Sequence, residues 1–162
     1  MHLFFTIPFV EGEEERNSDF ASGITATTDV PRAEETNKVR LLVAEDDQTI
    51  RQILGTMLQR SGYETDFAEN GQSVVEMWEN GKYDLILMDV QMPLMNGFEA
   101  AAAIREIERT RGGHIPIIAM TAHAFKEDKQ RCLDAGMDTY ISKSIDFART
   151  RQVIRETLEN VS

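Results

Sequence analysis

Residues 83–97 read Tyr83-Asp84-Leu85-Ile86-Leu87-Met88-Asp89-Val90-Gln91-Met92-Pro93-Leu94-Met95-Asn96-Gly97. Within this stretch Leu85 to Met88 form an unbroken apolar run that ends at Asp89. Such a run, without polar alternation, is typical of a strand that is buried on both faces, as in parallel sheets. Open α/β sheets bind ligands beyond the carboxyl ends of their strands. Asp89 is therefore a nucleophile, a metal ligand or a turn-forming residue, depending on what the other strand ends contribute.

Similar runs recur through residues 38–160. We predict strands at 39–44, 63–68, 85–88, 115–120 and 139–142, of which 39–44, 85–88 and 115–120 are mainly apolar. Helical patterns follow them at 50–58, 71–78, 98–110, 126–135 and 147–160. In the last helix we expect Phe147, Ile154 and Leu158 to face the core. Five strands that alternate with five helices predict a doubly wound α/β domain, in which right-handed crossovers place helices on both faces of a parallel sheet.

The composition narrows the classes of partner. The 162 residues carry a formal net charge of −11, which argues against duplex nucleic acid and anionic membrane, because phosphate binding needs a basic surface. The single cysteine, Cys132, excludes an internal disulfide framework and suits a reducing compartment. No apolar run is long enough to span a bilayer. We therefore expect a cytoplasmic domain without direct membrane contact.

The first 37 residues differ in character from the rest. Residues 1–10 are apolar but lack the basic region and cleavage site of a signal peptide, so we interpret them as a remnant of an upstream domain. Residues 11–37 are polar, with no helical or strand period. Their acidic residues are Glu11, Glu13, Glu14, Glu15, Asp19, Asp29, Glu34 and Glu35. Such a segment buries too little apolar surface to offset its ordering entropy, so we interpret it as a disordered acidic linker.

Polar side chains follow four of the five predicted strands. Glu45 and Asp46 come after the first strand, Asp89 after the third, Thr121 after the fourth and Lys143 after the fifth. Because the carboxyl ends of parallel strands share one edge of the sheet, we expect these side chains to converge. Three carboxylates in one crevice repel each other unless a cation joins them, and a hard divalent cation such as Mg²⁺ suits oxygen ligands.

The lysine and the threonine extend this prediction to phosphoryl chemistry. Lys143 adds a positive charge and Thr121 a hydroxyl donor, so the crevice suits a phosphoryl group that is attached to, or arriving at, an acid. Carboxylates are known nucleophiles in such transfers and form acyl phosphates. Each residue also has a plain structural explanation, since acids and Thr121 cap helices, Asp89 forms turns and lysines are usually solvated.

Four motifs resemble the receiver domain of two-component response regulators. They are Leu42-Val43-Ala44-Glu45-Asp46-Asp47, Asp89-Val90-Gln91-Met92-Pro93-Leu94-Met95-Asn96-Gly97, Ala119-Met120-Thr121-Ala122 and Gly136-Met137-Asp138-Thr139-Tyr140-Ile141-Ser142-Lys143. The second motif is the most specific of the four, and the resemblance covers about residues 39–160. It implies the flavodoxin-like (βα)5 fold, with strand order 2-1-3-4-5.

The resemblance implies a role for each residue of the acidic group. Asp89 would be the phosphoacceptor and a metal ligand. Asp46 would bind Mg²⁺, or alternatively Mn²⁺, directly, and Glu45 would act through a bound water. The backbone carbonyl of Gln91 would complete the protein ligands. Gln91 and His123, each two residues beyond a site residue, would influence how fast the phosphoaspartate hydrolyses.

The resemblance also implies how phosphorylation of the site changes the rest of the domain. Thr121 and Lys143 would hold the phosphoryl oxygens, and Tyr140 would be the switch aromatic that turns inward when Thr121 moves. The chain departs from the family at Ser144, where a proline usually follows the lysine, commonly through a cis peptide. A non-proline cis bond is costly, so this loop is either trans or strained, and the direction of Lys143 depends on which.

Together these features imply a receiver for phosphorelay signal transduction. It would take a phosphoryl group from a phosphohistidine of a histidine kinase dimerisation domain or a histidine phosphotransfer protein. The switching surface would comprise residues 126–135, 139–142 and 147–160. No ATP-binding glycine motif is present, so the chain would catalyse only its own phosphorylation and dephosphorylation. Residues 4–9 resemble the end of a kinase ATP-binding domain, so we expect a piece of a hybrid sensor kinase, which would be tethered to a membrane where its parent protein is a membrane sensor kinase.

Two other protein classes share parts of the pattern. A phosphohydrolase of the haloacid dehalogenase type also uses an aspartate nucleophile, threonine, lysine and Mg²⁺. Its general acid, an aspartate two residues beyond the nucleophile, is replaced here by Gln91. A flavodoxin-like flavin binder needs a phosphate-cradling loop after the first strand, where Glu45-Asp46-Asp47 would repel the flavin phosphate. The phosphohydrolase is therefore the alternative to a receiver.

Overall fold

The computed structural model describes residues 37–123, 125–144 and 146–161. Its strands are β1 (Arg40–Ala44), β2 (Glu64–Ala68), β3 (Leu85–Asp89), β4 (Ile117–Thr121) and β5 (Thr139–Ser142). They form one sheet in the order β2-β1-β3-β4-β5, and every neighbouring pair is parallel. The predicted doubly wound fold with strand order 2-1-3-4-5 is confirmed. The interpretations of residues 1–10 and 11–36 lie outside the described residues.

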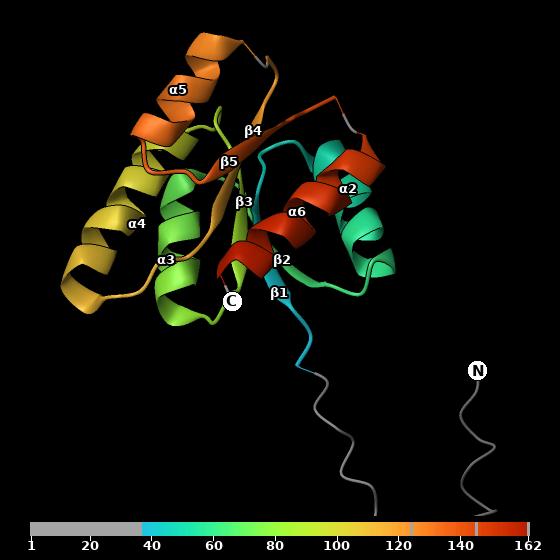
Figure 1. Cartoon of the computed structure of the whole chain (residues 1–162), viewed down its shortest axis with the longest axis horizontal. Helices are drawn as coiled ribbons and strands as arrows, with labels where there is room; N and C mark the ends of the chain where they lie inside the picture. The colour runs from blue at the N-terminus through green and yellow to red at the C-terminus, as the bar shows by residue number, and fades with distance from the viewer. Residues whose placement is uncertain (1–36, 124, 145, 162) are drawn as a thin grey trace, which may run out of the picture. The chain divides into compact units, whose positions relative to one another are not determined.

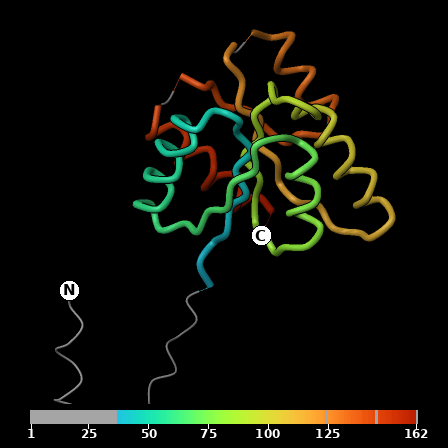
Figure 2. The backbone as a smooth tube through the Cα atoms, turned by 180° about the vertical axis from the view of Figure 1, so that it is seen from behind, coloured from blue at the N-terminus to red at the C-terminus, as the bar shows by residue number. Residues whose placement is uncertain are grey.

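In the described part of the chain, five helices cover the two faces of the sheet. They are α2 (Gln48–Arg60), α3 (Gly71–Asn80), α4 (Gly97–Arg111), α5 (Lys126–Asp134) and α6 (Phe147–Val161). Figure 1 shows α3, α4 and α5 on one side of the sheet and α2 and α6 on the other, and the view from behind in Figure 2 shows the same separation. Among the described helices, none combines the length and the apolar character that a bilayer span requires.

Alternating strand residues build a separate core on each face of the sheet. In β1, Leu41 and Val43 pack with α2 and α6, whereas Leu42 and Ala44 pack with α3, α4 and α5. All five residues of β3 are buried, as expected for a strand covered on both faces. Because β3 lies between β1 and β4, its last residue, Asp89, sits at the middle of the carboxyl edge.

Local sequence fixes the turn that follows β3. The Asn96 side chain accepts from the Glu99 N–H, and the Glu99 carboxylate accepts from the Asn96 N–H, so the two form a reciprocal cap on α4. Gly97 begins the helix, and a Cβ at this position would collide with the Asp89 carbonyl oxygen. Glycine therefore lets the start of α4 approach the end of β3 and holds the β3–α4 turn close to Asp89.

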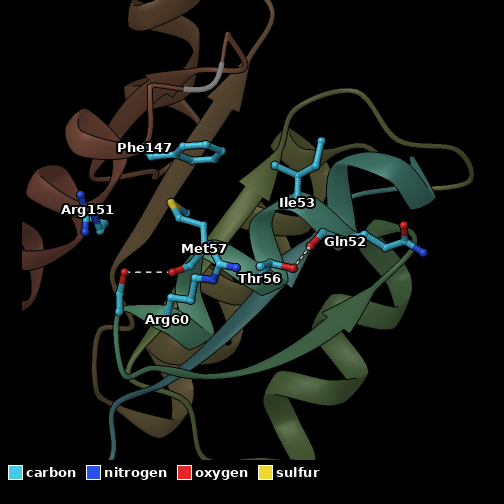
Figure 3. Close-up of a pocket in the computed structure, with 8 residues that line it drawn as sticks. Gln52, Ile53, Thr56, Met57, Arg60, Phe147 and Arg151 are labelled. Atoms are coloured by element: carbon cyan, nitrogen blue, oxygen red, sulfur yellow. Dashed lines mark hydrogen bonds between the residues drawn. The ribbon is translucent and has the colours of Figure 1, made fainter.

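One prediction about the core is wrong. Ile154 is fully buried and Leu158 packs beside the same core, but Phe147 is 44% exposed. Phe147 lies two turns before Ile154 on the same helical face, in the first turn of α6. That turn faces α2 rather than the sheet, because Phe147 lines a groove with Ile53 and Met57 of α2. The helical period was correct, but the first turn of α6 borders a groove that is open to solvent (Figure 3).

Candidate functional site

The predicted acidic residues converge at the carboxyl edge of the sheet. Glu45 and Asp46 directly follow β1, and Asp89 ends the neighbouring strand β3. One carboxylate oxygen from each of the three lies within 4.8 Å of the others. Glu45 and Asp89 are 0% and 1% exposed, whereas Asp46 is exposed. The group is therefore a buried carboxylate pair that reaches solvent through Asp46.

Lys143 enters this group from the end of β5. Its Nζ lies 2.7 Å from Asp89 Oδ2 and 3.1 Å from Glu45 Oε2. The other Asp89 oxygen, Oδ1, accepts from the Gln91 N–H at 2.9 Å. All peptide bonds between described residues are trans, the Lys143–Ser144 bond included. Lys143 therefore reaches both buried carboxylates without the proline that usually follows it in receivers.

Burial sets the electrostatics of the three charged groups. Loss of hydration raises the pKa of Glu45 to about 7, although the Asp47 N–H and Lys143 stabilise its charged form. Burial likewise raises the pKa of Asp89, against the opposing effect of its bonds from Lys143 and the Gln91 N–H. Burial alone would lower the pKa of Lys143, but the two carboxylates together outweigh it and raise that pKa. One ammonium thus leaves part of the carboxylate charge uncompensated.

The acidic group fits a hard divalent cation. Oxygens bound to Mg²⁺ lie about 2.1 Å from the ion, so opposite ligands are about 4.2 Å apart. The 4.8 Å spread of the three carboxylates needs only small side-chain rotations to match this. Glu45 Oε2 is buried and, among the described residues, accepts no hydrogen bond. Its charged neighbour is Lys143 Nζ at 3.1 Å, which also contacts Asp89, so a cation or its water would supply the hydrogen bond or coordination that this oxygen lacks. Glu45, Asp46 and Asp89 therefore have the donor set and the electrostatic need for Mg²⁺.

Thr121 lies at the end of β4, next to the acidic group in the strand order. Its buried hydroxyl donates to the His123 carbonyl at 2.8 Å and accepts from the His123 N–H at 3.2 Å. Thr121, Gln91 and His123 line a cleft of about 230 Å³ between the β3–α4 and β4–α5 connections. In this conformation the hydroxyl is therefore bonded to its own loop, at the wall of a cleft that also contains Gln91.

Tyr140 occupies the middle of β5. The side chain is half-buried against the core on the α3–α5 face, and Lys129 Nζ lies 5.2 Å from the ring centroid. β5 pairs with β4, where Tyr140 is opposite Ala119, two residues before Thr121. The strand therefore places Tyr140 beside α5, two register positions before the pairing of Ser142 with Thr121.

The sequence reasoning did not single out Arg51. Its Nη1 donates to the carbonyl oxygens of Glu45 at 2.8 Å and Asp46 at 3.1 Å, and its Nη2 pairs with Glu69 at 3.0 Å. The side chain thus clamps the backbone of the acidic loop to the end of β2. The sequence feature that could have indicated this role is an arginine in the first turn of the helix that follows an acidic run.

Comparison with known proteins identifies the family. The model of the response regulator receiver domain matches residues 41–155. The chain belongs to the response regulator receiver family. This assignment favours the receiver interpretation over the phosphohydrolase and the flavin binder.

Several individual relatives are sensor histidine kinases. Hybrid signal transduction histidine kinase I of Dictyostelium discoideum is 45% identical over 120 residues, which cover 71% of this chain and 7% of the relative. The chain spans between 6% and 16% of the length of such curated relatives. Many of them are hybrid histidine kinases, so the similarity concerns their receiver portions.

Two solved receiver structures bear on the site. The receiver domain of sensor histidine kinase PA1611 from Pseudomonas aeruginosa, solved with a magnesium ion in its active-site cleft, has a TM-score of 0.69 and 32% identity, and the match covers 75% of this chain and 98% of that one. The co-crystal structure of the Saccharomyces cerevisiae histidine phosphotransfer protein Ypd1 with the Ssk1 receiver gives a TM-score of 0.71 and 32% identity, over 74% of this chain and 88% of the other.

Proposed function

We propose that this receiver accepts a phosphoryl group from a phosphohistidine onto Asp89 in a phosphorelay. The observation that carries the proposal is the contact between Lys143 Nζ and Asp89 Oδ2 at 2.7 Å, inside the acidic group. A lysine held on a buried carboxylate at the end of the central strand provides a nucleophile and a cation at one point. Asp46 and Glu45 supply the further charge that a metal-assisted transfer requires.

The transfer follows from the charges in the crevice. An Asp89 oxygen attacks phosphorus, the P–N bond of the phosphohistidine breaks, and its electron pair stays on the imidazole nitrogen. Lys143 exchanges its bond with Asp89 for bonds to the phosphoryl oxygens. Mg²⁺, or Mn²⁺ in its place, held by Asp46, Asp89 and the Gln91 carbonyl, with Glu45 acting through water, would offset the negative charge on these oxygens.

Thr121 and Tyr140 form the proposed switch. The Thr121 hydroxyl exchanges its bond with the His123 carbonyl for a bond to a phosphoryl oxygen, which draws the β4–α5 loop toward Asp89. Tyr140 then turns into the space that Thr121 leaves, so that the surface of α5, β5 and α6 changes. The support for this step is the present bond of Thr121 to its own loop and the half-buried position of Tyr140.

The family relatives suggest the context. We propose that the chain is the receiver portion of a hybrid histidine kinase, with residues 38–160 as the domain, residues 11–37 as an acidic linker and residues 1–10 as a remnant of an upstream domain. Its partners are then a histidine kinase dimerisation domain or a histidine phosphotransfer protein in the cytoplasm. In this role the chain catalyses only its own phosphorylation and dephosphorylation.

Acetyl phosphate with Mg²⁺ tests the acceptor without a protein donor. Intact-mass analysis of the full chain should show one phosphoryl adduct that is lost on hydroxylamine treatment, and Asp89→Asn should show none while keeping its circular dichroism spectrum. An adduct of equal yield on Asp89→Asn would contradict the assignment. Steady release of inorganic phosphate without an adduct would favour the phosphohydrolase.

A further inference from the structure

The Ser142 side chain bonds across Lys143 to the residue that follows it. Ser142 is the last residue of β5, and its Oγ accepts from the Ser144 N–H at 3.2 Å and lies 2.7 Å from the Ser144 Oγ. A serine hydroxyl that bonds to the backbone two residues further along the chain stabilises a tight turn. Because Lys143 is the residue in between, these bonds fix the direction of the chain at Lys143.

The backbone on both sides of this turn is anchored to the rest of the fold. The Lys143 N–H donates to the Thr121 carbonyl at 2.8 Å, next to the pairing of β5 with β4. The Ser144 carbonyl accepts from the Asp146 N–H at 2.9 Å, directly before α6. Between these two anchors, the Ser142 hydroxyl joins the end of the strand to the residue beyond Lys143.

The position of the Lys143 ammonium depends on this turn. Its Nζ contacts Asp89 Oδ2 at 2.7 Å and Glu45 Oε2 at 3.1 Å, from the end of a long and flexible side chain. Holding such a side chain in one direction costs conformational entropy, and a backbone that already points it at the acidic group lowers this cost. A turn with a free hydroxyl at its start would let the ammonium move away from both carboxylates.

The bonds of Ser142 require a residue with an N–H at position 144. A proline there would fix φ through its ring, but it would have no N–H for the Ser142 hydroxyl to accept. In this chain the Lys143–Ser144 peptide is trans, and the hydroxyl bonds of Ser142 hold it. The turn is therefore fixed by side-chain hydrogen bonds where receivers usually have a proline ring.

We propose that Ser142 is a positioning residue, which directs Lys143 at Asp89 through the bonds between its hydroxyl and Ser144. Ser142 acts through Lys143 and not on the phosphoryl group. This role deepens the proposed function and rests on it for the rate of phosphoryl transfer, in which Lys143 bonds to the phosphoryl oxygens. A misplacement of about 1 Å in a catalytic group can slow a reaction by about a hundredfold. Loss of the hydroxyl should therefore slow the transfer without abolishing it.

Labelling of the full chain by acetyl phosphate and Mg²⁺ tests this role. Ser142→Ala should lower the rate constant at saturating acetyl phosphate at least about fivefold, because it removes both bonds. Ser142→Thr keeps a hydroxyl on a residue type that strands favour, and it should restore the rate to within about twofold of the wild type. Ser144→Ala keeps the N–H and should give a rate between these two.

A second serine provides the matched control. Ser61→Ala also removes a hydroxyl that bonds within its own turn, to the Met57 carbonyl at 2.9 Å, but at the end of α2. It should leave the rate constant within about twofold of the wild type, because additive effects are expected at distant sites. Circular dichroism spectra of all variants should match that of the wild type.

The direction of Lys143 can also be measured without phosphorylation. In proton–nitrogen correlation spectra, a lysine ammonium gives a sharp signal when carboxylates hold it and loses that signal to exchange with water when it is free. In EDTA the wild type should show such a signal for Lys143, identified by its absence from Lys143→Gln. Ser142→Ala should lose the signal or broaden it, whereas Ser142→Thr should keep it.

The two readouts separate the role of Ser142 from that of Asp89. If the wild type takes no label, the proposed function fails, and the ammonium signals still decide whether Ser142 positions Lys143. An ammonium signal that is unchanged in Ser142→Ala would overturn this role, and so would a wild type that labels no faster than Ser142→Ala. A Ser142→Thr variant as slow as Ser142→Ala would also overturn it, because the defect would then come from packing and not from the hydroxyl.

Discussion

Replacing Glu45 with glutamine should stabilise the cation-free protein at alkaline pH. Glu45 is fully buried, and burial raises its pKa from 4.5 to about 7. The folded state therefore binds a proton more tightly than the unfolded chain, and the free energy of unfolding falls as the pH rises from about 4.5 to about 7. Glutamine keeps the acceptor for the Asp47 N–H at 3.1 Å but carries no charge, so the variant avoids this loss.

The magnitude follows from the two pKa values. A tenfold difference in proton affinity corresponds to about 1.4 kcal/mol, so an ionised Glu45 costs the folded state up to about 3 kcal/mol at pH 8 and below about 1 kcal/mol at pH 5. The amide of the variant would face Lys143, which offsets part of the gain. We therefore expect Glu45→Gln to raise the free energy of unfolding by about 1–3 kcal/mol at pH 8 and by much less at pH 5.

Urea unfolding in EDTA, followed by circular dichroism at pH 5 and pH 8, measures this difference. Asp46→Asn is the matched control, because it removes a carboxylate from the same loop where the side chain is exposed, and it should change stability by less than about 0.5 kcal/mol. Added Mg²⁺ should stabilise the wild type more than Glu45→Gln, so the difference in the free energy of unfolding between the two proteins should become smaller. A variant that is no more stable than the wild type at pH 8, or whose advantage shrinks as the pH rises, would refute this reasoning.

Three further predictions concern the site and its support. The affinity of the wild type for Mg²⁺ should rise between pH 6 and pH 8, because Glu45 ionises in this range and binding of the cation releases its proton. Calorimetry in buffers of different ionisation enthalpy measures this proton release, and Glu45→Gln should show none. Gly97→Ala should cost about 1–3 kcal/mol in urea unfolding and slow phosphorylation, because its Cβ meets the Asp89 carbonyl oxygen; unchanged stability would contradict the close packing. Asn96→Ala should cost about 1 kcal/mol through loss of the α4 cap, and a change below about 0.3 kcal/mol would argue against that cap.

The fold could be predicted from the sequence because the central strands have a clear apolar pattern. The run from Leu85 to Met88 has no polar residue, and a strand of that kind needs cover on both faces. A parallel sheet then requires helical crossovers, which the intervening residues supply. Strand order does not follow from such patterns, and here it came from the resemblance to receivers.

The site could be predicted because its chemistry lies at strand ends. Topology alone brings Glu45, Asp46, Asp89, Thr121 and Lys143 to one edge, whatever the details of their side chains. The contacts among them could not be predicted, since the bond of Thr121 to the His123 carbonyl and the position of Lys143 between two carboxylates depend on loop geometry. The role of Arg51 could not be predicted because Nη1 donates to backbone carbonyl oxygens, which every residue type provides.

The groove between α2 and α6 shows where helical periodicity does not predict which side chains are buried. Phe147 has the spacing of a core residue relative to Ile154, but it lies in the first turn of α6 and lines a groove with α2 instead.

The acceptor itself can be identified by chemical reduction of the phosphorylated protein. Borohydride converts an aspartyl phosphate to homoserine, so the chain would be treated with acetyl phosphate and Mg²⁺, reduced, digested and sequenced by mass spectrometry. The present account predicts homoserine at position 89 alone, with Asp46 and Glu45 unchanged. Reduction at Asp46 or Glu45, with Asp89 intact, would contradict it.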